Sequence, residues 1–248
     1  MKKIGFLGCG KIGQALLKHI KEKRYGQVVF IEDPFADLPG EPVVRSPREE
    51  LYGETELVIE CCTADVLKEH IELILKHGDL LMFSVTAFSD ETFEKKAREL
   101  CGKYGRKIYI PHGAILGTDG IFDGKPVWES VEITTTKSPK SLGRTDTERT
   151  VVYEGPAREA CRLYPRNVNV HAAIALAGIG FDRTKSRIVS DPAVSTNAHE
   201  IRLKGSGIDI AMHIESYAAG AVTGAYTPWS ACGSLDRICG EDSGTRFV

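Results

Sequence analysis

The stretch KKIGFLGCGKIGQALLKHI, residues 2–20, places a short apolar run directly before three closely spaced glycines and an amphipathic helical pattern. The glycines are Gly8, Gly10 and Gly13, in the spacing GxGxxG. Glycine inside a regular element costs roughly 0.5–1 kcal/mol relative to alanine, so this cluster requires a reason. The context predicts a strand, turn and helix that hold the pyrophosphate of a dinucleotide, although the spacing alone also fits an ordinary tight turn.

Each position of the turn has its own expected role. Gly8 permits the sharp turn, Gly10 lets the phosphates approach the backbone, and Gly13 lets the helix pack closely on the strand. Lys11 and Ile12 begin the helix, and their backbone N–H groups would point at the phosphates together with the positive end of the helix dipole.

A second apolar run, VVFIED, ends on Asp33, twenty residues after Gly13. At this distance an acidic side chain commonly accepts hydrogen bonds from the adenosine ribose. We expect Asp33 to do so, assisted by Glu32, and two acidic groups followed by Pro34 favour NAD over NADP because they would repel a 2′-phosphate. NADP is retained as an alternative, and so is a simple solvated turn at this place.

Residues 1–111 alternate apolar runs with amphipathic patterns. This alternation predicts an α/β fold, a Rossmann-like doubly wound parallel sheet with helices on both faces. The expected strands are Lys3–Leu7, Gln27–Glu32, Leu57–Glu60, Leu80–Val85 and Lys107–Ile110, and the expected helices are Ile12–Glu22, Ala64–Lys76 and Asp90–Cys101.

Small side chains follow two of these strands, at the edge where a doubly wound sheet binds its ligand. Cys61, Cys62 and Thr63 follow one strand, and Thr86 and Ala87 follow the next. We expect all five to line the cofactor site. The alternative for the two cysteines is that they fill space as small buried hydrophobes.

The pattern changes after Pro111. Residues 127–137 and 184–191 alternate with period two, residues 200–215 form a hairpin pattern across Gly205–Gly207, and Ala157–Leu163 and Val168–Ile179 are helical. These features predict a second, α+β mixed-sheet domain. Residues 216–235 carry no charge, but their glycines, proline and hydroxyl groups favour a buried closing segment over a membrane span.

Composition restricts the partners. The net charge is −2 and the basic residues are dispersed, so neither nucleic acid nor a membrane surface is expected as a partner, which leaves a small molecule. The seven cysteines include no CxxC pair, which favours free thiols in a cytoplasmic protein and gives no metal signature. The first residues also lack the apolar stretch of a secretion signal.

Histidine is the side chain most suited to proton transfer near neutral pH. His19, His70 and His77 fall on helix surfaces or ends and are expected to be solvated, and His213 alternates within a strand. Three candidates remain: His112, His171 and His199. The last falls in an expected loop, two residues after Asn197.

A succession of motifs resembles the L-aspartate dehydrogenase family in order, up to about residue 204. The motifs are GCGKIG, VIEC, SVTAF, PHGAILGTDGI, TTTKSPKSLG, VVYEG, YPRNVNV and SDPAVSTNAHEI. The resemblance implies a dinucleotide domain of residues 1–111 plus about 216–248, and a substrate and dimerisation domain of residues 112–215. It also implies a homodimer that oxidises aspartate to iminoaspartate with NAD or NADP.

The resemblance assigns roles to individual residues. It implies that His199 is the acid/base group, that Ala114 lies at the nicotinamide end, and that Asn169 contacts cofactor or substrate. The two carboxylates of aspartate need donors, for which Lys140, Ser141 and Asn197 are the candidates. Alternatively, the lysines of 137–140 are solvated and the asparagines of 167–169 cap a helix.

This chain departs from the family pattern at three places. His112 and His171 stand where the family usually has small residues, and the uncharged segment lacks the expected motif that opens a final helix. These departures leave two further hypotheses open. One is a dehydrogenase for another amino acid or a diamine, and the other is a catalytically silent NAD-binding sensor.

Overall fold

The computed structural model describes residues 2–217 and 224–240, and the chain forms two compact units. The first comprises Met1–Pro111 and Pro228–Val248, and the second comprises His112–Thr227. The second unit therefore ends twelve residues beyond the expected boundary at residue 215.

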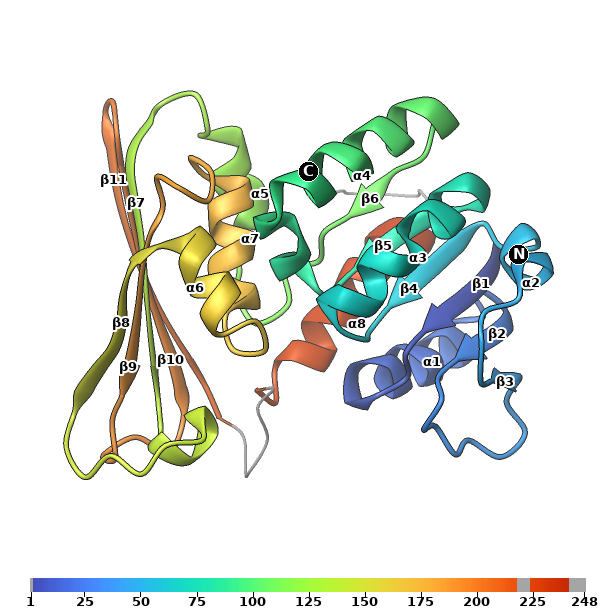
Figure 1. Cartoon of the computed structure of the whole chain (residues 1–248), viewed down its shortest axis with the longest axis horizontal. Helices are drawn as coiled ribbons and strands as arrows, with labels where there is room; N and C mark the ends of the chain where they lie inside the picture. Colours follow the sequence, from blue (N-terminus) through green and yellow to red (C-terminus); the bar gives the residue numbers. More distant parts are fainter. Residues whose placement is uncertain (1, 218–223, 241–248) are drawn as a thin grey trace. The chain divides into compact units, whose positions relative to one another are not determined.

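A six-stranded parallel sheet forms the centre of the first unit (Figure 1). Its strand order is β3-β2-β1-β4-β5-β6, so the order reverses between β1 and β4, where a doubly wound sheet places its ligand. The predicted Rossmann-like sheet is confirmed. The strands are β1 (Lys2–Leu7), β2 (Gly26–Glu32), β3 (Val43–Val44), β4 (Leu57–Glu60), β5 (Asp79–Met82) and β6 (Ile108–Tyr109).

Helices cover both faces of this sheet. Helix α1 (Lys11–Lys23) lies on one face, and α3 (Ala64–His77) with α4 (Glu91–Tyr104) lies on the other (Figure 1). The short α2 (Glu49–Gly53) precedes β4. The bounds of the predicted helices agree with these to within three residues, and the predicted start of α3 at Ala64 is the observed one. The predicted strand 80–85 is too long, because the chain turns after Met82 into a 3₁₀ helix, η1 (Val85–Ser89).

The uncharged segment contains a helix that the sequence did not indicate. Residues 218–223 lie outside the described part of the chain, and α8 (Thr227–Cys239) follows, with Pro228 in its first turn. Ala231 and Leu235 are fully buried in the core that α1 forms with β1. Asp236 accepts hydrogen bonds from Tyr25 at 2.7 Å and pairs with His19 at 2.5 Å, so the prediction of a solvated His19 is wrong.

A mixed five-stranded sheet forms the second unit, in the order β11-β10-β7-β9-β8. Only β7 and β9 are parallel neighbours. The expected α+β mixed sheet is confirmed, but one edge strand, β8, was not predicted. The strands are β7 (Trp128–Lys137), β8 (Thr150–Pro156), β9 (Lys185–Ser190), β10 (Asn197–Gly205) and β11 (Ile208–Ser216).

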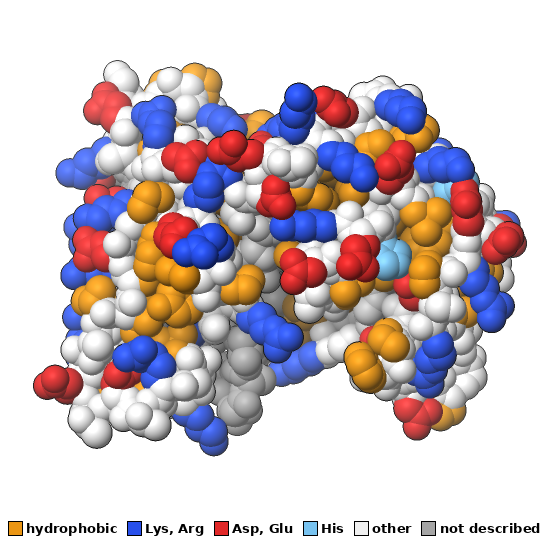
Figure 2. All heavy atoms as spheres, in the orientation of Figure 1, with side chains coloured by type: hydrophobic (Ala, Val, Ile, Leu, Met, Phe, Trp, Pro, Cys, Tyr) orange, Lys and Arg blue, Asp and Glu red, His pale blue; other side chains and the backbone are white. Residues whose placement is uncertain are grey.

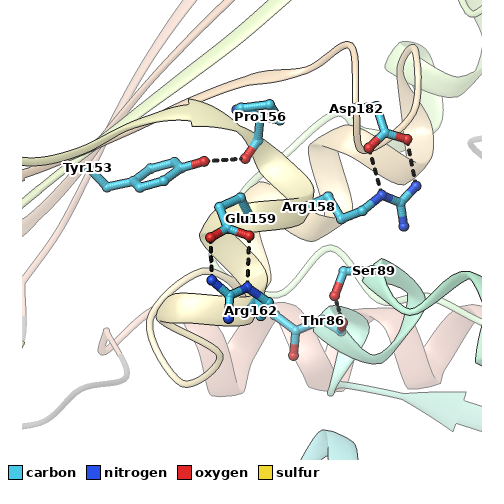
Figure 3. A network of polar contacts seen from close by, with 8 residues as sticks. All are labelled: Thr86, Ser89, Tyr153, Pro156, Arg158, Glu159, Arg162 and Asp182. Atoms are coloured by element: carbon cyan, nitrogen blue, oxygen red, sulfur yellow. Dashed lines mark hydrogen bonds and ion pairs between the residues drawn. The ribbon is translucent and has the colours of Figure 1, made fainter.

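Three helices, α5 (Thr118–Asp123), α6 (Ala157–Leu163) and α7 (Asn169–Ala177), cover one face of this sheet (Figure 1). Side chains of β7 and β10 alternate between that buried face and an outer polar face. Arg158 at the start of α6 forms two 2.7 Å hydrogen bonds to Asp182, and Glu159 pairs with Arg162 one turn later (Figure 3). The Arg158–Asp182 pair fixes α6 to the chain that leads into β9, and the Glu159–Arg162 pair lies within the helix itself.

The visible surface of each unit mixes acidic, basic and apolar side chains without a large patch of one charge (Figure 2). In residues 2–217 and 224–240, no helix combines the length and the apolar character needed to cross a membrane.

Candidate active site

The glycine turn lies between the ends of β2 and β4. Gly8 donates its N–H to the Glu32 carbonyl at 2.8 Å, and Leu7 accepts from the Cys61 N–H at 2.8 Å. Gly8 has a φ of +81°, and a Cβ there would lie 2.9 Å from the Cys61 carbonyl oxygen. Glycine is therefore required at this position by both conformation and space.

Gly13 and Gly10 differ in what surrounds them. A Cβ on Gly13 would lie 3.2 Å from the Gly8 carbonyl oxygen, so Gly13 allows α1 to pack against the turn. Gly10 has an ordinary φ of −70°, and a Cβ there would meet no atom of the described residues within 4 Å. The protein itself gives no reason for glycine at position 10, whereas a phosphate resting on the backbone does.

The N-terminus of α1 has no side-chain cap. Gly10 is the N-cap residue, and the first turn contains no acidic residue. The N–H groups of Lys11 and Ile12 have no partner within the helix, as in any first turn. These features fit the pyrophosphate of a dinucleotide.

Asp33 is held against the turn. One carboxylate oxygen accepts the Cys9 N–H at 2.8 Å, and the other accepts the N–H groups of Phe35 and Ala36 at 2.8 and 3.0 Å. Arg45, which the sequence analysis missed, donates to the carbonyl oxygens of Asp33 and Ala36 and is exposed beside them.

Glu32 does not share this position, so the expectation that it assists Asp33 is corrected. Its carboxylate is buried and accepts the Tyr52 hydroxyl at 2.7 Å, while its second oxygen bonds to His70 Nε2 at 2.9 Å. His70 is consequently not solvated, and the Glu32 hydrogen bond raises its pKa. The pair fastens α3 to the end of β2.

A buried carboxylate, Glu60, organises the ends of β4 and β5. It accepts hydrogen bonds from the backbone N–H groups of Cys62, Phe83 and Ser84 at 2.8 to 3.0 Å, and from the Ser84 hydroxyl at 2.7 Å. These bonds turn the chain away from β5 at residue 83. The only signal in the sequence was an acidic residue at the end of an apolar strand.

The predicted cofactor residues after these strands lie at the same carboxyl edge. Burial raises the pKa values of the Cys61 and Cys62 thiols, so both stay protonated and act as small neutral side chains. Thr63 is the N-cap of α3. Thr86 and Ala87 are buried in η1, where the Thr86 carbonyl accepts the Ser89 hydroxyl (Figure 3).

His199 lies inside the second unit. It belongs to strand β10, not to a loop as predicted, and its side chain is only 3% exposed on the face covered by the helices. Its Nδ1 is 2.9 Å from the hydroxyl of Thr135, the neighbouring residue on β7. Burial, with a smaller contribution from the charge of Lys137, lowers the pKa of His199 to about 4, so the imidazole is neutral at physiological pH.

Lys137 is also buried on this face, two residues after Thr135 on β7. Its ammonium donates to the Asn167 side-chain oxygen at 3.2 Å, and within the described part of the chain no carboxylate lies at ion-pair distance. Burial lowers its pKa to about 8. A buried cation without an anion is costly, so this ammonium is suited to bind an anionic group of a ligand.

The predicted substrate residues differ in position. Asn197 is buried at the start of β10, whereas Lys140 is exposed on a 3₁₀ turn, η2 (Pro139–Leu142). The Ser141 hydroxyl lies 2.9 Å from that of Ser138 in the same turn. Lys137 lies on the same buried face as Thr135 and His199, close enough for its charge to affect the pKa of His199, whereas Lys140 is exposed. The sequence offered a signal for this position, because Lys137 ends an alternating strand on its buried face.

Asn169, Ala114 and His171 complete the candidates. Asn169 is the first residue of α7 and is exposed, and Ala114 is half-buried in the loop before α5. His171 is fully buried in α7, with both ring nitrogens hydrogen-bonded to protein side chains. In residues 2–217 and 224–240, no group of three or more His, Cys, Asp or Glu residues is placed to hold a metal ion.

Comparison with known proteins agrees with both units. Residues 8–111 match the family model described as homoserine dehydrogenase, NAD binding domain, and residues 124–238 match aspartate dehydrogenase, C-terminal. L-aspartate dehydrogenase of Methanococcoides burtonii is 34% identical, over 83% of this chain and 84% of the relative. That of Archaeoglobus fulgidus is 36% identical, over 82% of each.

A solved structure extends the comparison to the whole fold. The crystal structure of aspartate dehydrogenase from Thermotoga maritima matches with a TM-score of 0.83 and 29% identity, over 100% of both chains. A Rossmann-like domain with a dinucleotide turn, joined to a mixed-sheet domain with a buried polar cluster, defines a nicotinamide-dependent dehydrogenase. The chain belongs to the L-aspartate dehydrogenase family.

Proposed function

We propose that this protein oxidises the amine of L-aspartate to iminoaspartate, or runs the reverse reductive amination, with a nicotinamide cofactor. The proposal rests mainly on two residues that are buried on the same face of the second unit. His199 is neutral, and Lys137 lacks an anionic partner among the described residues. In an amino acid with a second carboxylate, that carboxylate could bind to the Lys137 ammonium, and the substrate ammonium could give its proton to His199.

The cofactor would bind at the glycine turn, through Gly8, Gly10 and Gly13 and the N–H groups of Lys11 and Ile12. The residues Cys61, Cys62, Thr63, Thr86, Ala87, Ala114 and Asn169 are proposed as its further contacts. When bound, the nicotinamide supplies the two-electron acceptor for the hydrogen on the carbon that bears the amine.

NAD is the proposed cofactor, because the Asp33 carboxylate would accept hydrogen bonds from a ribose and repel a 2′-phosphate. The exposed Arg45 beside it supports weaker use of NADP, since a guanidinium binds phosphate well. Titration with each cofactor, followed by the quenching of tryptophan fluorescence, tests this order of affinity. In Arg45→Ala, NADP affinity should fall more than NAD affinity.

His199 is the proposed acid/base group. Oxidation requires a neutral amine, so a proton must leave the substrate ammonium, and a neutral imidazole within hydrogen-bond reach can accept it. The same group can then activate water for hydrolysis of the imine. Lys137 would bind one carboxylate by a charge-assisted hydrogen bond, and Asn197, Lys140 and Ser141 remain the other proposed substrate contacts.

The structure bears on the rival substrates. A diamine would bring a second cation towards Lys137, which the charge of that residue disfavours. His171 uses both ring nitrogens inside the protein and therefore offers none to a substrate. A dicarboxylic amino acid is the better fit.

The test is NADH formation by the purified protein with L-aspartate, L-glutamate, L-alanine and a diamine. We expect aspartate to be the best substrate and His199→Ala to lose about 100-fold or more of kcat. Turnover of the diamine alone would favour the rival substrate class. Cofactor binding without turnover of any amine would favour the redox sensor.

Two further expectations accompany this function. The resemblance implies a homodimer, for which light scattering should give twice the mass of one chain. A cytoplasmic location suits the seven free cysteines and a nicotinamide-dependent reaction. Fractionation of the source cells tests it.

A further inference from the structure

A chain of buried side chains leads away from His199 into the second unit. The Thr135 hydroxyl oxygen lies 2.9 Å from His199 Nδ1 and 2.6 Å from His171 Nε2. His171 Nδ1 lies 2.9 Å from the Ser186 hydroxyl oxygen. The four side chains come from β10, β7, α7 and β9, and none is more than 3% exposed. A second imidazole therefore lies one hydroxyl group away from His199.

The Thr135 hydroxyl couples the two rings. It has one proton, so it can donate to only one of the two ring nitrogens beside it. The other nitrogen must then donate its own N–H to the hydroxyl oxygen. Since both rings are neutral, they adopt the same tautomer: either both carry the proton on Nε2, or both carry it on Nδ1.

Ser186 distinguishes the two arrangements. In the first, Ser186 donates to His171 Nδ1, His171 donates from Nε2 to Thr135, and Thr135 donates to His199 Nδ1. Both hydroxyl protons and the His171 N–H then have acceptors, and of these four side chains it is the Nε2–H of His199 that is left over. In the second, His171 donates to Ser186, and the Ser186 proton has no acceptor within the described part of the chain. A fully buried hydroxyl proton without an acceptor is costly, and Ser186 is 0% exposed whereas His199 is 3% exposed, so the first arrangement is favoured.

We propose that His171 is a positioning residue that acts through Thr135 to hold His199 as the neutral tautomer with its proton on Nε2 in the resting protein. The proposal rests on the proposed function, in which Nε2 of His199 exchanges protons with substrate or water. That nitrogen has no hydrogen-bond partner within residues 2–217 and 224–240. With its proton on Nε2, His199 can donate at that nitrogen, as the reductive direction requires, and it can accept a proton from the substrate ammonium there only after its own proton has passed to water. His171 thereby sets the proton state in which His199 meets the substrate.

Nitrogen NMR of the full-length protein with ¹⁵N-labelled histidine tests the coupling without any turnover. Signals are assigned with His171→Asn and His199→Asn. We expect both rings to show the Nε2–H pattern at neutral pH, and Thr135→Val to convert His199 to a mixture of tautomers while Thr135→Ser retains the single form. Opposite tautomers in the wild type, or an unchanged His199 in Thr135→Val, would overturn the proposal.

Kinetics with aspartate provide the second readout. Loss of the hydroxyl in Thr135→Val should lower kcat about 10- to 100-fold, as loss of outer-shell partners commonly does, with little change in KM. Thr135→Ser should restore most of the rate. Thr134→Val is the matched control, because Thr134 precedes Thr135 on β7 and points to the opposite face.

The outcomes separate the two proposals. Equal rates for Thr135→Val and Thr134→Val would contradict the positioning role of His171. A wild-type protein that turns over no amine would contradict the proposed function, and the NMR spectra would still decide whether the two rings are coupled.

Discussion

At the scale of single residues, burial determines the chemistry of the candidate site. Lys137 and His199 project from neighbouring strands onto one covered face, and loss of solvent lowers the pKa of each. The result is an imidazole that is neutral at physiological pH and an ammonium that lacks an anion among the described residues. Both states suit a site that receives a negatively charged amino acid.

Lys137 should therefore bind a carboxylate. Lys137→Met should weaken competitive inhibition by succinate, a dicarboxylate without an amine, about 10-fold or more, because a charge-assisted hydrogen bond is lost. In the wild type the inhibition constant should rise above about pH 8, where the ammonium with its lowered pKa loses its proton. Lys140→Met should have a much smaller effect. Equal effects of the two substitutions would contradict this assignment.

His171 should make the protein sensitive to acid. Burial lowers its pKa from 6.5 to about 3, so between these values the unfolded chain binds a proton that the folded protein excludes. Stability is thus lost as the pH falls below 6.5, by about 2 kcal/mol at pH 5 for this group. Urea unfolding at pH 7 and pH 5 should show a smaller loss in His171→Asn. His213→Asn, on the exposed edge strand, should behave as the wild type.

At the scale of elements, the glycine turn, the strand ends and the closing helix position the cofactor site. The turn could be predicted in detail, because Gly8, Gly10 and Gly13 lie between two strongly patterned elements. The 3₁₀ helix after β5 could not, since it depends on Glu60 accepting hydrogen bonds from residues more than twenty positions away. Helix α8 was missed because its buried residues, Ala231 and Leu235, pack on the core that α1 forms with β1, more than 200 residues earlier in the chain. The local pattern of residues 227–239 does not show this contact.

Substitution of Gly8 should mainly affect the stability of the protein, and substitution of Gly10 should mainly affect cofactor binding. Gly8→Ala should lower the free energy of unfolding by about 1–3 kcal/mol, because its φ is +81° and a Cβ would press on the Cys61 carbonyl. Gly10→Ala should change stability by less than about 1 kcal/mol, yet weaken NADH binding strongly. Urea unfolding and calorimetric titration measure the two effects. A Gly10→Ala protein that binds NADH normally would contradict a cofactor on this turn.

At the scale of the whole molecule, the sequence was most informative where a local pattern coincides with function. The parallel sheet, the mixed sheet and the motif order of the family followed from residues 1–204. The buried network of His171, Thr135 and His199 did not, because three separate elements bring it together and the sequence suggested a loop at His199. Lys140 remains a predicted substrate contact, and burial on β7 adds Lys137 as a candidate that the sequence analysis had not proposed.

On the proposed function, this chain removes the hydrogen from the amine-bearing carbon of aspartate and transfers it to the nicotinamide. The most direct measurement mixes the purified protein with NAD and L-aspartate deuterated at that carbon, and determines the mass of the reduced cofactor. We expect NADH that carries the deuterium, formed about 100-fold or more slowly by His199→Ala. Bound NAD that stays oxidised, or reduced cofactor without deuterium, would contradict it.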